Sequence, residues 1–598
     1  MTLYSIHFVV ALLLSAALPL FGRIPLKKRL LASVCSPIIL YICFYNFDYT
    51  LLGGPVPFVI SYVGAIYSAC LCLLLFSFNK AEFDSCCSKN PFAKCVVSDI
   101  SVLFFLSLIF TIPWAIDTFP LSNVEAVLFT IFAGKNEGAE EFVLSGFKGK
   151  VFFPVLETFI VVELVQLVLT FALLRRHIFC KAKIWKIHLS FNHRCFPQVF
   201  WQTKKATFAI LGIYAAILLL VLPGIVVSAP FKALIQQPVD SEFYRENYVN
   251  PDSVKIITRG EPRNLIVIFL ESMEKNFAQY TPEIVRLENS SLDFFPGGQN
   301  VSGTSWTIAG ITGKLCGIPL NMPMGINEYH GKLPTYVPYA KCLMNILADK
   351  GYNQLYVQGT SGDFTQKKDF WKSHGDVEIH DIEYYKSAGK IPEDYQVFWG
   401  FEDRKLYHLA KEELDSLSHL NKSFAFYMLT IDTHQPQGYL DDSCKAALEN
   451  VGVVVDNSNI FPAALRCASM QLGSFLSWMQ KQSWFDKTVV YVMGDHATPS
   501  LSVKSNLSQS DSLYWTNFVM NASLDNGKNY RPGRGYSSLD IFPTILETMG
   551  FEIDGHAIAL GRSLFADLPT LLEKYGKKKL DSLLRERSVQ YDYFLMGH

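Results

Sequence analysis

The chain has 598 residues, 50% of them hydrophobic, and a formal net charge of -1 at pH 7. This length exceeds that of one ordinary domain and suits a membrane region followed by a catalytic domain. The near-neutral charge, with only short basic clusters beside apolar segments, argues against a nucleic-acid partner.

The apolar excess is concentrated in roughly the first 230 residues. A helix needs roughly 20 apolar residues to span a bilayer, and six stretches approach or reach that length. The second and fourth are short, so five spans would also fit. The first could instead be a signal peptide, although it lacks a basic start and a small-x-small cleavage site. The stretches are Leu3–Phe21, Leu31–Phe47, Phe58–Phe78, Val102–Thr118, Val151–Leu174 and Phe208–Val227.

The loops between these stretches differ in charge. Lys and Arg collect after the first, third and fifth stretches, as expected of cytoplasmic loops. The loop at 48–57 has no Lys or Arg, and the loop at 136–141 is acidic. We therefore expect an outside N-terminus and a transmembrane domain over 1–230. A juxtamembrane connector over 231–262 and an extracytoplasmic catalytic domain over 263–598 follow it.

Four of the thirteen cysteines fall in the outer part of the chain, namely Cys316, Cys342, Cys444 and Cys467. Thiols in an oxidising compartment favour disulfides, and four cysteines allow three pairings. Pairing in sequence order encloses the shortest loops and is the preferred prediction. Metal binding by these cysteines is disfavoured because no C-x-x-C spacing occurs among them.

The outer part alternates short apolar runs, rich in β-branched and aromatic residues, with helical patterns. This alternation predicts an α/β fold with a mostly parallel sheet covered by helices on both faces. Function in such sheets lies beyond the carboxyl ends of the strands. The four runs are Leu265–Leu270, Gln354–Gln358, Phe424–Thr430 and Val489–Met493.

Chemically capable residues directly follow three of these runs. Glu271 follows the first, His434 comes shortly after the third, and Asp495 and His496 follow the fourth. A carboxylate beside an imidazole after a tight turn can present two metal ligands to one cleft. Each feature alone also has an ordinary explanation, since Asp often caps a helix and a charge often marks the first solvated residue after a strand.

The segment GTSWTIAGITGKLCGIPL, which begins at Gly303, supplies a possible nucleophile. We expect a helix to start after Thr304, which would place its hydroxyl at the positive helix terminus. A divalent cation there would favour the alkoxide, a nucleophile for attack on phosphorus. An isolated Gly-Thr-Ser is otherwise an ordinary helix cap.

Four ordered motifs, NLIVIFLESMEKNF, GTSWTIAGITGKLCGIPL, LTIDTHQP and VVYVMGDHATPS, follow the multi-span region. Together they resemble the alkaline phosphatase/sulfatase superfamily, in its branch of lipoteichoic acid synthases and phosphoglycerol or phosphoethanolamine transferases. The second motif is most similar to that of phosphoglycerol transferases that decorate periplasmic glucans. The resemblance covers about Arg263 to Leu564 and includes a late SSLDIFPTILETMGF stretch.

The resemblance implies a role for several positions. Glu271, Thr304, Asp495 and His496 match the metal site, with Thr304 as nucleophile, and His434 matches a substrate-positioning histidine. Trp371 and Ser500 match residues that hold glycerophosphate in lipoteichoic acid synthases. Those synthases have an Arg two residues after the Trp, where this chain has Ser373, so phosphate would be anchored elsewhere, with Lys372 and Lys367 as candidates.

The resemblance further implies an alkaline-phosphatase-like (sulfatase-like) catalytic domain anchored in the bacterial inner membrane and facing the periplasm. Its reaction would move phosphoglycerol from phosphatidylglycerol to an envelope glycan or lipid-linked sugar through a covalent threonine intermediate. One divalent cation is expected. Mn²⁺ is preferred because only one of the four ligands is a His, and Zn²⁺ or Mg²⁺ would also fit.

Other functions remain open. A phosphoethanolamine transferase acting on lipopolysaccharide or another envelope sugar would share the nucleophile and the metal. A catalytically silent envelope-assembly protein is a further alternative, but such a protein would not need the intact set of candidate metal-site residues. A channel would account for the apolar stretches and would leave the outer domain unexplained. A sulfatase is disfavoured, because its C/S-x-P/A-x-R pattern is missing after Thr304.

Overall fold

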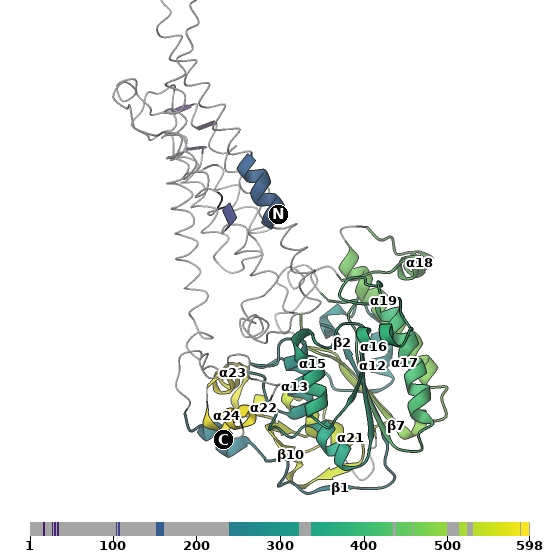
Figure 1. Ribbon diagram of the computed structural model, residues 1–598. Coiled ribbons are helices and arrows are strands. Elements are labelled where there is room, and N and C mark those ends of the chain that lie inside the picture. The colour runs from purple at the N-terminus through teal and green to yellow at the C-terminus, as the bar shows by residue number, and fades with distance from the viewer. Residues whose placement is uncertain are drawn as a thin grey trace, which may run out of the picture. The chain divides into compact units, whose positions relative to one another are not determined.

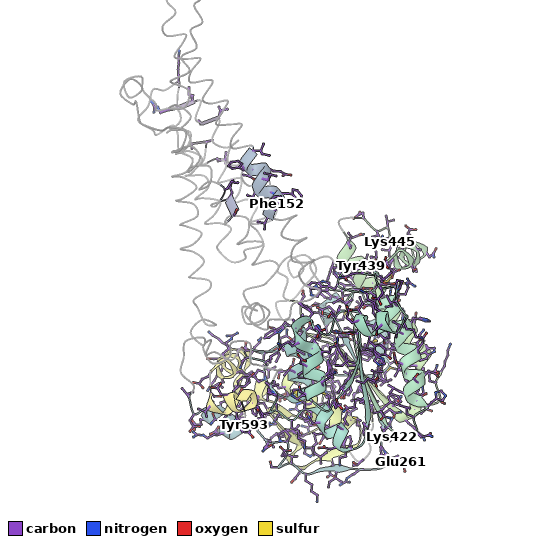
Figure 2. All side chains as sticks on the ribbon, viewed as in Figure 1. Phe152, Glu261, Lys422, Tyr439, Lys445 and Tyr593 are labelled. Carbon is purple, nitrogen blue, oxygen red and sulfur yellow. A yellow bond between two sulfur atoms is a disulfide. The ribbon has the colours of Figure 1, made fainter. Side chains whose placement is uncertain are left out.

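The computed structural model describes a short part of the N-terminal region and most of the outer domain. Residues 151–160 are helical and expose large apolar side chains, among them Phe152 (Figure 2). The six expected membrane stretches otherwise lie outside the described residues, apart from a few isolated positions. No helix within the described residues is long and apolar enough to cross a bilayer. The described ranges are 151–160, 239–321, 337–434, 438–456, 459–498, 514–522, 530–586 and 588–596.

A seven-stranded sheet forms the centre of the described outer domain, in the order β3-β8-β7-β2-β6-β4-β5 (Figure 1). The five strands from β7 to β5 run parallel, whereas β8 is antiparallel to β7 and to β3. The prediction of a mostly parallel sheet is confirmed, and the four predicted runs match β2, β4, β6 and β7. The strands are β2 Asn264–Leu270, β3 Leu292–Asp293, β4 Asn353–Gln358, β5 Glu378–His380, β6 Phe424–Leu429, β7 Thr488–Gly494 and β8 Asn517–Met520.

The central strands are apolar on both faces, because helices cover each face. Alternate residues of β2 enter two different hydrophobic clusters, with Val267 in one and Ile268 in the other. One face packs against α13 Thr307–Cys316, α14 Leu343–Asp349, α15 Lys367–Ser373 and α21 Ile541–Thr548. The other packs against α12 Pro282–Asn289, α16 Ile382–Ser387, α17 Asp403–Ser418 and α19 Ile460–Met479. This arrangement confirms the prediction of helices on both faces.

The expected connector over 231–262 is partly wrong. Its described residues include α11 Glu242–Asn247, which buries Phe243 and Tyr244 in the core, and β1 Ile256–Thr258, which pairs with β9 Phe551–Ile553. The buried aromatic pair explains why this polar-looking segment folds with the domain. The remaining elements are α18 Asp442–Asn450, β10 Ala557–Ile558, β11 Gly561–Arg562, α22 Leu571–Tyr575, α23 Lys577–Arg585, α24 Val589–Met596, η5 Lys275–Phe277, η6 Phe364–Gln366, η7 Phe485–Lys487, η8 Ser538–Asp540 and η9 Asp554–His556.

The four outer cysteines form two disulfides, Cys316–Cys342 and Cys444–Cys467. The predicted pairing in sequence order is therefore confirmed. The first bond joins the end of α13 to the start of α14, and the second joins α18 to α19.

Helix α13 lies unusually close to the end of β7. A Cβ atom added to Gly310 would stand 2.1 Å from the carbonyl oxygen of Asp495, and one added to Gly313 would stand 2.9 Å from Thr304 Cγ2. Atoms cannot approach that closely without a shift of backbone. Glycine at these two positions therefore sets the distance between the helix N-terminus and the carboxyl edge of the sheet.

We predict that Gly310→Ala destabilises the protein by about 1–3 kcal/mol, because the new methyl group overpacks a rigid contact. Thermal unfolding of the purified protein measures the effect. Gly473→Ala on α19 is the matched control, since its Cβ would meet only the side chain of Glu283, at 3.3 Å. Equal stability of the two variants would contradict the proposed role of Gly310.

Candidate active site

The carboxyl ends of β2 and β7 bring Glu271 together with the adjacent pair Asp495 and His496, more than 200 residues later in the sequence. Ligand atoms of Glu271, Asp495 and His496 all lie within 4.8 Å of one another, and all three side chains are buried. Because β2 and β7 are adjacent parallel strands, their ends meet at the same edge of the sheet. We call these residues the acidic-histidine cluster.

Ser272 holds both carboxylates of this cluster. Its backbone N–H donates to Asp495 Oδ1 (2.8 Å), and its hydroxyl donates to Glu271 Oε1 (2.7 Å). It does so from a left-handed backbone conformation with φ of 51°, which is uncommon for a residue with a side chain. Strained backbone of this kind persists where the surrounding structure requires it, often at functional sites.

The imidazole of His496 is oriented for metal binding. Its Nδ1 lies 2.9 Å from the carbonyl oxygen of Ala497, so Nδ1 carries the proton and donates it. Nε2 is then left with a lone pair, 3.4 Å from Asp495 Oδ2 and 3.7 Å from Glu271 Oε1. An Nδ1–H bonded to a carbonyl with Nε2 facing the ion is the usual arrangement of a metal-ligating histidine.

The cluster has the properties of a cation site. Burial and the neighbouring Asp495 carboxylate raise the pKa of Glu271 well above its ordinary value. Asp495 Oδ2 is buried and accepts no hydrogen bond from the described residues. Two buried carboxylates repel each other, and a divalent cation between them and Nε2 would offset that repulsion and use the spare oxygen. The donor set therefore fits a divalent cation.

Besides Ser272, Thr307 brings a hydroxyl to the acidic-histidine cluster. Thr307 is the first residue of α13, and its Oγ1 donates to Glu271 Oε2 at 3.3 Å. Thr304 instead donates to the carbonyl of Val301 (2.8 Å) and accepts from the Val301 N–H (3.0 Å). The prediction that Thr304 lies at the helix N-terminus is wrong, because the helix begins three residues later.

His434 lies at the same edge of the sheet, after β6. The residue before it, Thr433, donates its hydroxyl to the carbonyl oxygen of Glu271 at 2.6 Å. His434 itself is half-buried, and its ring centre is 4.7 Å from that of Trp399. The bond from Thr433 thus ties the segment that carries His434 to the backbone of Glu271, a member of the acidic-histidine cluster.

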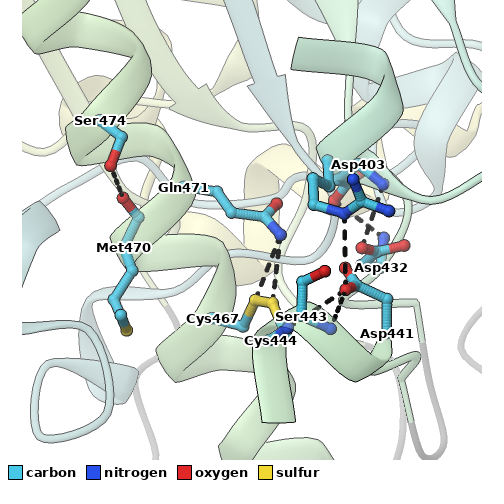
Figure 3. The surroundings of a disulfide bond; sticks show 10 residues. Asp403, Asp432, Asp441, Ser443, Cys444, Cys467, Met470, Gln471 and Ser474 are labelled. Atoms are coloured by element: carbon cyan, nitrogen blue, oxygen red, sulfur yellow. Dashed lines mark hydrogen bonds and ion pairs between the residues drawn. A yellow bond between two sulfur atoms is a disulfide. The ribbon is translucent and has the colours of Figure 1, made fainter. Parts of the chain in front are cut away.

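Buried acids hold the segment that carries His434. Asp403 accepts the N–H groups of Ile431 and Asp432, and Asp432 Oδ2 accepts the N–H of Asp403. Asp441 then caps α18 beside the Cys444–Cys467 disulfide, and Figure 3 shows these three aspartates grouped next to that bond. Burial raises the pKa of Asp403 to about 7.

The other residues predicted to bind substrate are Trp371, Ser500 and the lysines near Trp371, and they differ in burial. Trp371 is fully buried, with its ring stacked 4.3 Å from that of Tyr356. Direct contact with substrate does not fit this burial, because the apolar face of α15 turns the ring into the core. Ser500 lies outside the described residues. Of the two candidate phosphate anchors, Lys372 is exposed on α15.

Lys367 is buried near the cluster. Its Nζ donates to the carbonyl of Phe364 (3.1 Å), and no carboxylate of the described residues lies within ion-pair distance of it. Burial lowers the pKa of Lys367 to about 8, while the negative charge of Glu271 acts in the opposite direction. A buried ammonium group that forms no ion pair with the described carboxylates is suited to hold an anionic substrate.

Sequence reasoning missed Ser272, Thr307 and Lys314. Lys314 is fully buried and donates to the carbonyl of Asp495 at 2.6 Å, which fixes the backbone of that ligand. Thr307 could have been found, because Ile308, Ile311 and Leu315 follow it with helical spacing and mark where the helix starts. The pattern contains no comparable signal for Ser272 or Lys314.

The outer domain is similar in sequence to a known protein family and to curated proteins. Residues 263–551 match the family model described as Sulfatase. The chain is 30% identical over 308 residues to phosphoglycerol transferase I of Shigella flexneri, and the match covers 50% of this chain and 38% of that protein. The same figures hold for phosphoglycerol transferase I of Escherichia coli strain 55989. The match thus spans less than half the length of these curated relatives.

Two solved structures are also similar. The lipoteichoic acid synthase from Listeria monocytogenes has a TM-score of 0.40 at 20% identity, over 51% of this chain and 75% of that one. The lipooligosaccharide phosphoethanolamine transferase A from Neisseria meningitidis has a TM-score of 0.42 at 12% identity, over 96% of this chain and 98% of that one.

We predict that Ser272→Ala weakens divalent-cation binding by roughly 10–100-fold, as is common when a group that orients a metal ligand is removed. Calorimetric titration of Mn²⁺ into chelator-treated protein measures the change. Ser290→Ala is the matched control, because its hydroxyl bonds only to the Leu287 carbonyl on an exposed turn. Unchanged affinity in Ser272→Ala would show that its hydroxyl bond to Glu271 does not organise the site.

Proposed function

We propose that this protein, whose domain over residues 263–551 belongs to the alkaline phosphatase/sulfatase superfamily, transfers a phosphate-containing headgroup from a phospholipid to an envelope glycan. The finer proposal is phosphoglycerol from phosphatidylglycerol, moved by an enzyme anchored in the bacterial inner membrane with its catalytic domain in the periplasm. The similarity to phosphoglycerol transferase I supports this choice of headgroup.

One observation carries the proposal. The hydroxyl of Thr307 donates to Glu271 Oε2 at the N-terminus of α13, and Glu271 shares a buried cluster with Asp495 and His496. A hydroxyl, two carboxylates and an imidazole around one point are the groups required for covalent phosphoryl transfer. We therefore assign the nucleophile to Thr307 in place of Thr304.

Three side chains and one hydroxyl are available to hold a divalent cation. Glu271, Asp495 and His496 would hold the cation together with Thr307 Oγ1, with Mn²⁺ preferred because oxygen ligands predominate. When bound, the cation would lower the pKa of the hydroxyl and offset charge on the phosphate oxygens. Helix α13 adds its positive terminus at the same point, and Gly310 allows that terminus to come close.

Thr307 Oγ1 would attack the lipid phosphate, and the bond from phosphorus to the diacylglycerol oxygen would break. Thr307 Oγ1 would release its own proton to solvent as it attacks. His434 would donate the proton that the leaving oxygen needs and take up another from solvent. Lys367 would bind a non-bridging phosphate oxygen, taking the place of the Arg that related synthases have two residues after their Trp. The headgroup then stays on Thr307 until an acceptor hydroxyl removes it.

We predict that Thr307→Val lowers turnover by roughly three orders of magnitude or more, because it removes the nucleophile. Thr304→Val is the matched control. It is expected to keep activity within about fivefold while losing about 1–3 kcal/mol of stability, since its lost bonds are buried bonds to Val301. Turnover of labelled phospholipid and thermal unfolding measure the two effects. Loss of turnover in the Thr304 variant alone would return the nucleophile to that residue.

We predict that purified protein incubated with phosphatidylglycerol and Mn²⁺ gains a glycerophosphate group on Thr307, detected by mass spectrometry of its peptides. Phosphatidylethanolamine is tested in parallel. Phosphoethanolamine on Thr307 in place of glycerophosphate would change the headgroup assignment. A protein that stays unmodified with both lipids would favour the silent envelope-assembly alternative.

A further inference from the structure

Four half-buried aromatic rings lie next to His434. Ring centres are 5.5 Å apart for Phe364 and Trp399, and 4.7 Å apart for Trp399 and His434. The ring of Phe398 lies 6.3 Å from His434 and stacks on Tyr439 at 5.8 Å. We call Phe364, Phe398, Trp399 and Tyr439 the aromatic patch. Its rings come from three separate segments of the chain.

The aromatic patch adjoins the catalytic residues at two points. At one end, Lys367 Nζ lies 4.9 Å from the ring centre of Phe364, and the same lysine is influenced by the charge of Glu271. At the other end, His434 follows Thr433, whose hydroxyl bonds to the Glu271 backbone. The patch is therefore continuous with the proposed phosphate site.

Core packing does not account for these rings. Within the described residues, neither hydrophobic core cluster, nor the smaller cluster at α18 and α19, includes a ring of the aromatic patch, even among its partly buried neighbours. Half-exposed aromatic rings gathered outside a core more often mark a binding surface than a packing need.

The backbone that presents two of the rings is strained and tightly held. Phe398 has φ of 53°, although it is not a glycine. Val397 and Gly400 exchange backbone hydrogen bonds of 2.7 and 3.0 Å around it. Gly400 packs so closely on the end of β4 that an added Cβ would stand 2.0 Å from the Gly359 carbonyl oxygen. Strain maintained at the edge of a site indicates a functional requirement for the position of these rings.

We propose that the aromatic patch is the acceptor subsite and that it binds a pyranose ring of the acceptor glycan by stacking. This inference rests on the proposed function and extends it to the second half of the reaction. A pyranose has flat C–H faces that suit aromatic rings, and hydroxyl groups at its edge that can reach a neighbouring site. The cationic Lys367 at one end and the rings at the other match a phosphate next to a sugar.

The stacked sugar would bring one hydroxyl to the headgroup on Thr307. The hydroxyl oxygen forms a bond to phosphorus, and the bond from phosphorus to Thr307 Oγ1 breaks. The hydroxyl proton passes through His434 to the departing oxygen of Thr307, which regains its hydroxyl. All atoms of the headgroup remain on the acceptor, and no oxidant or reductant is needed.

The test uses the full-length protein in detergent with labelled phosphatidylglycerol and two acceptors, a soluble gluco-oligosaccharide and glycerol. Trp399→Ala is expected to raise KM for the oligosaccharide about tenfold, the factor for about 1.4 kcal/mol of lost stacking. The effect on glycerol, which has no ring to stack, is expected to be much smaller. Trp399→Phe should restore most of the affinity for the oligosaccharide.

Trp478→Ala is the matched control, because Trp478 is also half-buried but lies on α19 against Phe475 and Trp484. It should behave as wild type. Headgroup loading on Thr307 is measured for every variant and checks that each is folded. Wild-type loading and transfer combined with an unchanged oligosaccharide KM in Trp399→Ala would overturn the acceptor subsite and leave the proposed function standing.

Two further outcomes would also overturn the inference. If Trp399→Ala raises KM for phosphatidylglycerol and not for the oligosaccharide, the aromatic patch binds the lipid donor. If wild-type protein loads neither phosphatidylglycerol nor phosphatidylethanolamine onto Thr307, the proposed function itself fails and the subsite loses its premise.

Discussion

Two buried carboxylates, Glu271 and Asp495, lie side by side at the carboxyl edge of the sheet, and the rest of the site is organised around their repulsion. Like charges in a low-dielectric interior are costly unless they are neutralised or bound to a cation. The buried Lys314 does not pair with the Asp495 carboxylate, because it donates to the backbone carbonyl of that residue. Asp495 Oδ2 therefore accepts no hydrogen bond from the described residues. The residues present therefore fit a divalent cation.

The fold supplies the precision that this arrangement needs. Adjacent parallel strands β2 and β7 deliver the two carboxylates, and Ser272 bonds to both from a left-handed backbone. Gly310 allows α13 to approach the Asp495 backbone, which carries the helix terminus and Thr307 to the same point. The proposed nucleophile, the proposed metal ligands and the helix terminus therefore depend on one set of close backbone contacts.

A continuous row of contacts links the proposed phosphate anchor to His434. Lys367 lies over Phe364, Phe364 lies beside Trp399, and Trp399 lies beside His434. A transferase that exchanges two substrates at one nucleophile requires separate surfaces for the phosphate and for the acceptor. The acidic network of Asp403 and Asp432 holds the segment that bears His434, so rigid packing extends beyond the metal ligands.

The sequence alone predicted the mostly parallel sheet, its four main strands and, as the preferred one of three pairings, the two disulfides. It also singled out Glu271, Asp495 and His496, which the structure brings together. These follow from local signals, namely apolar runs, the residues that end them and the spacing of cysteines. Only the tertiary structure placed Thr307, and not Thr304, at the start of α13 beside Glu271, because this depends on where the helix begins against β7. The tertiary structure also shows that Trp371 is buried in the core. It shows the bonds that Ser272 and Lys314 make to the acidic-histidine cluster, and the aromatic patch. Their roles arise from contacts between segments far apart in the chain, which no local pattern encodes.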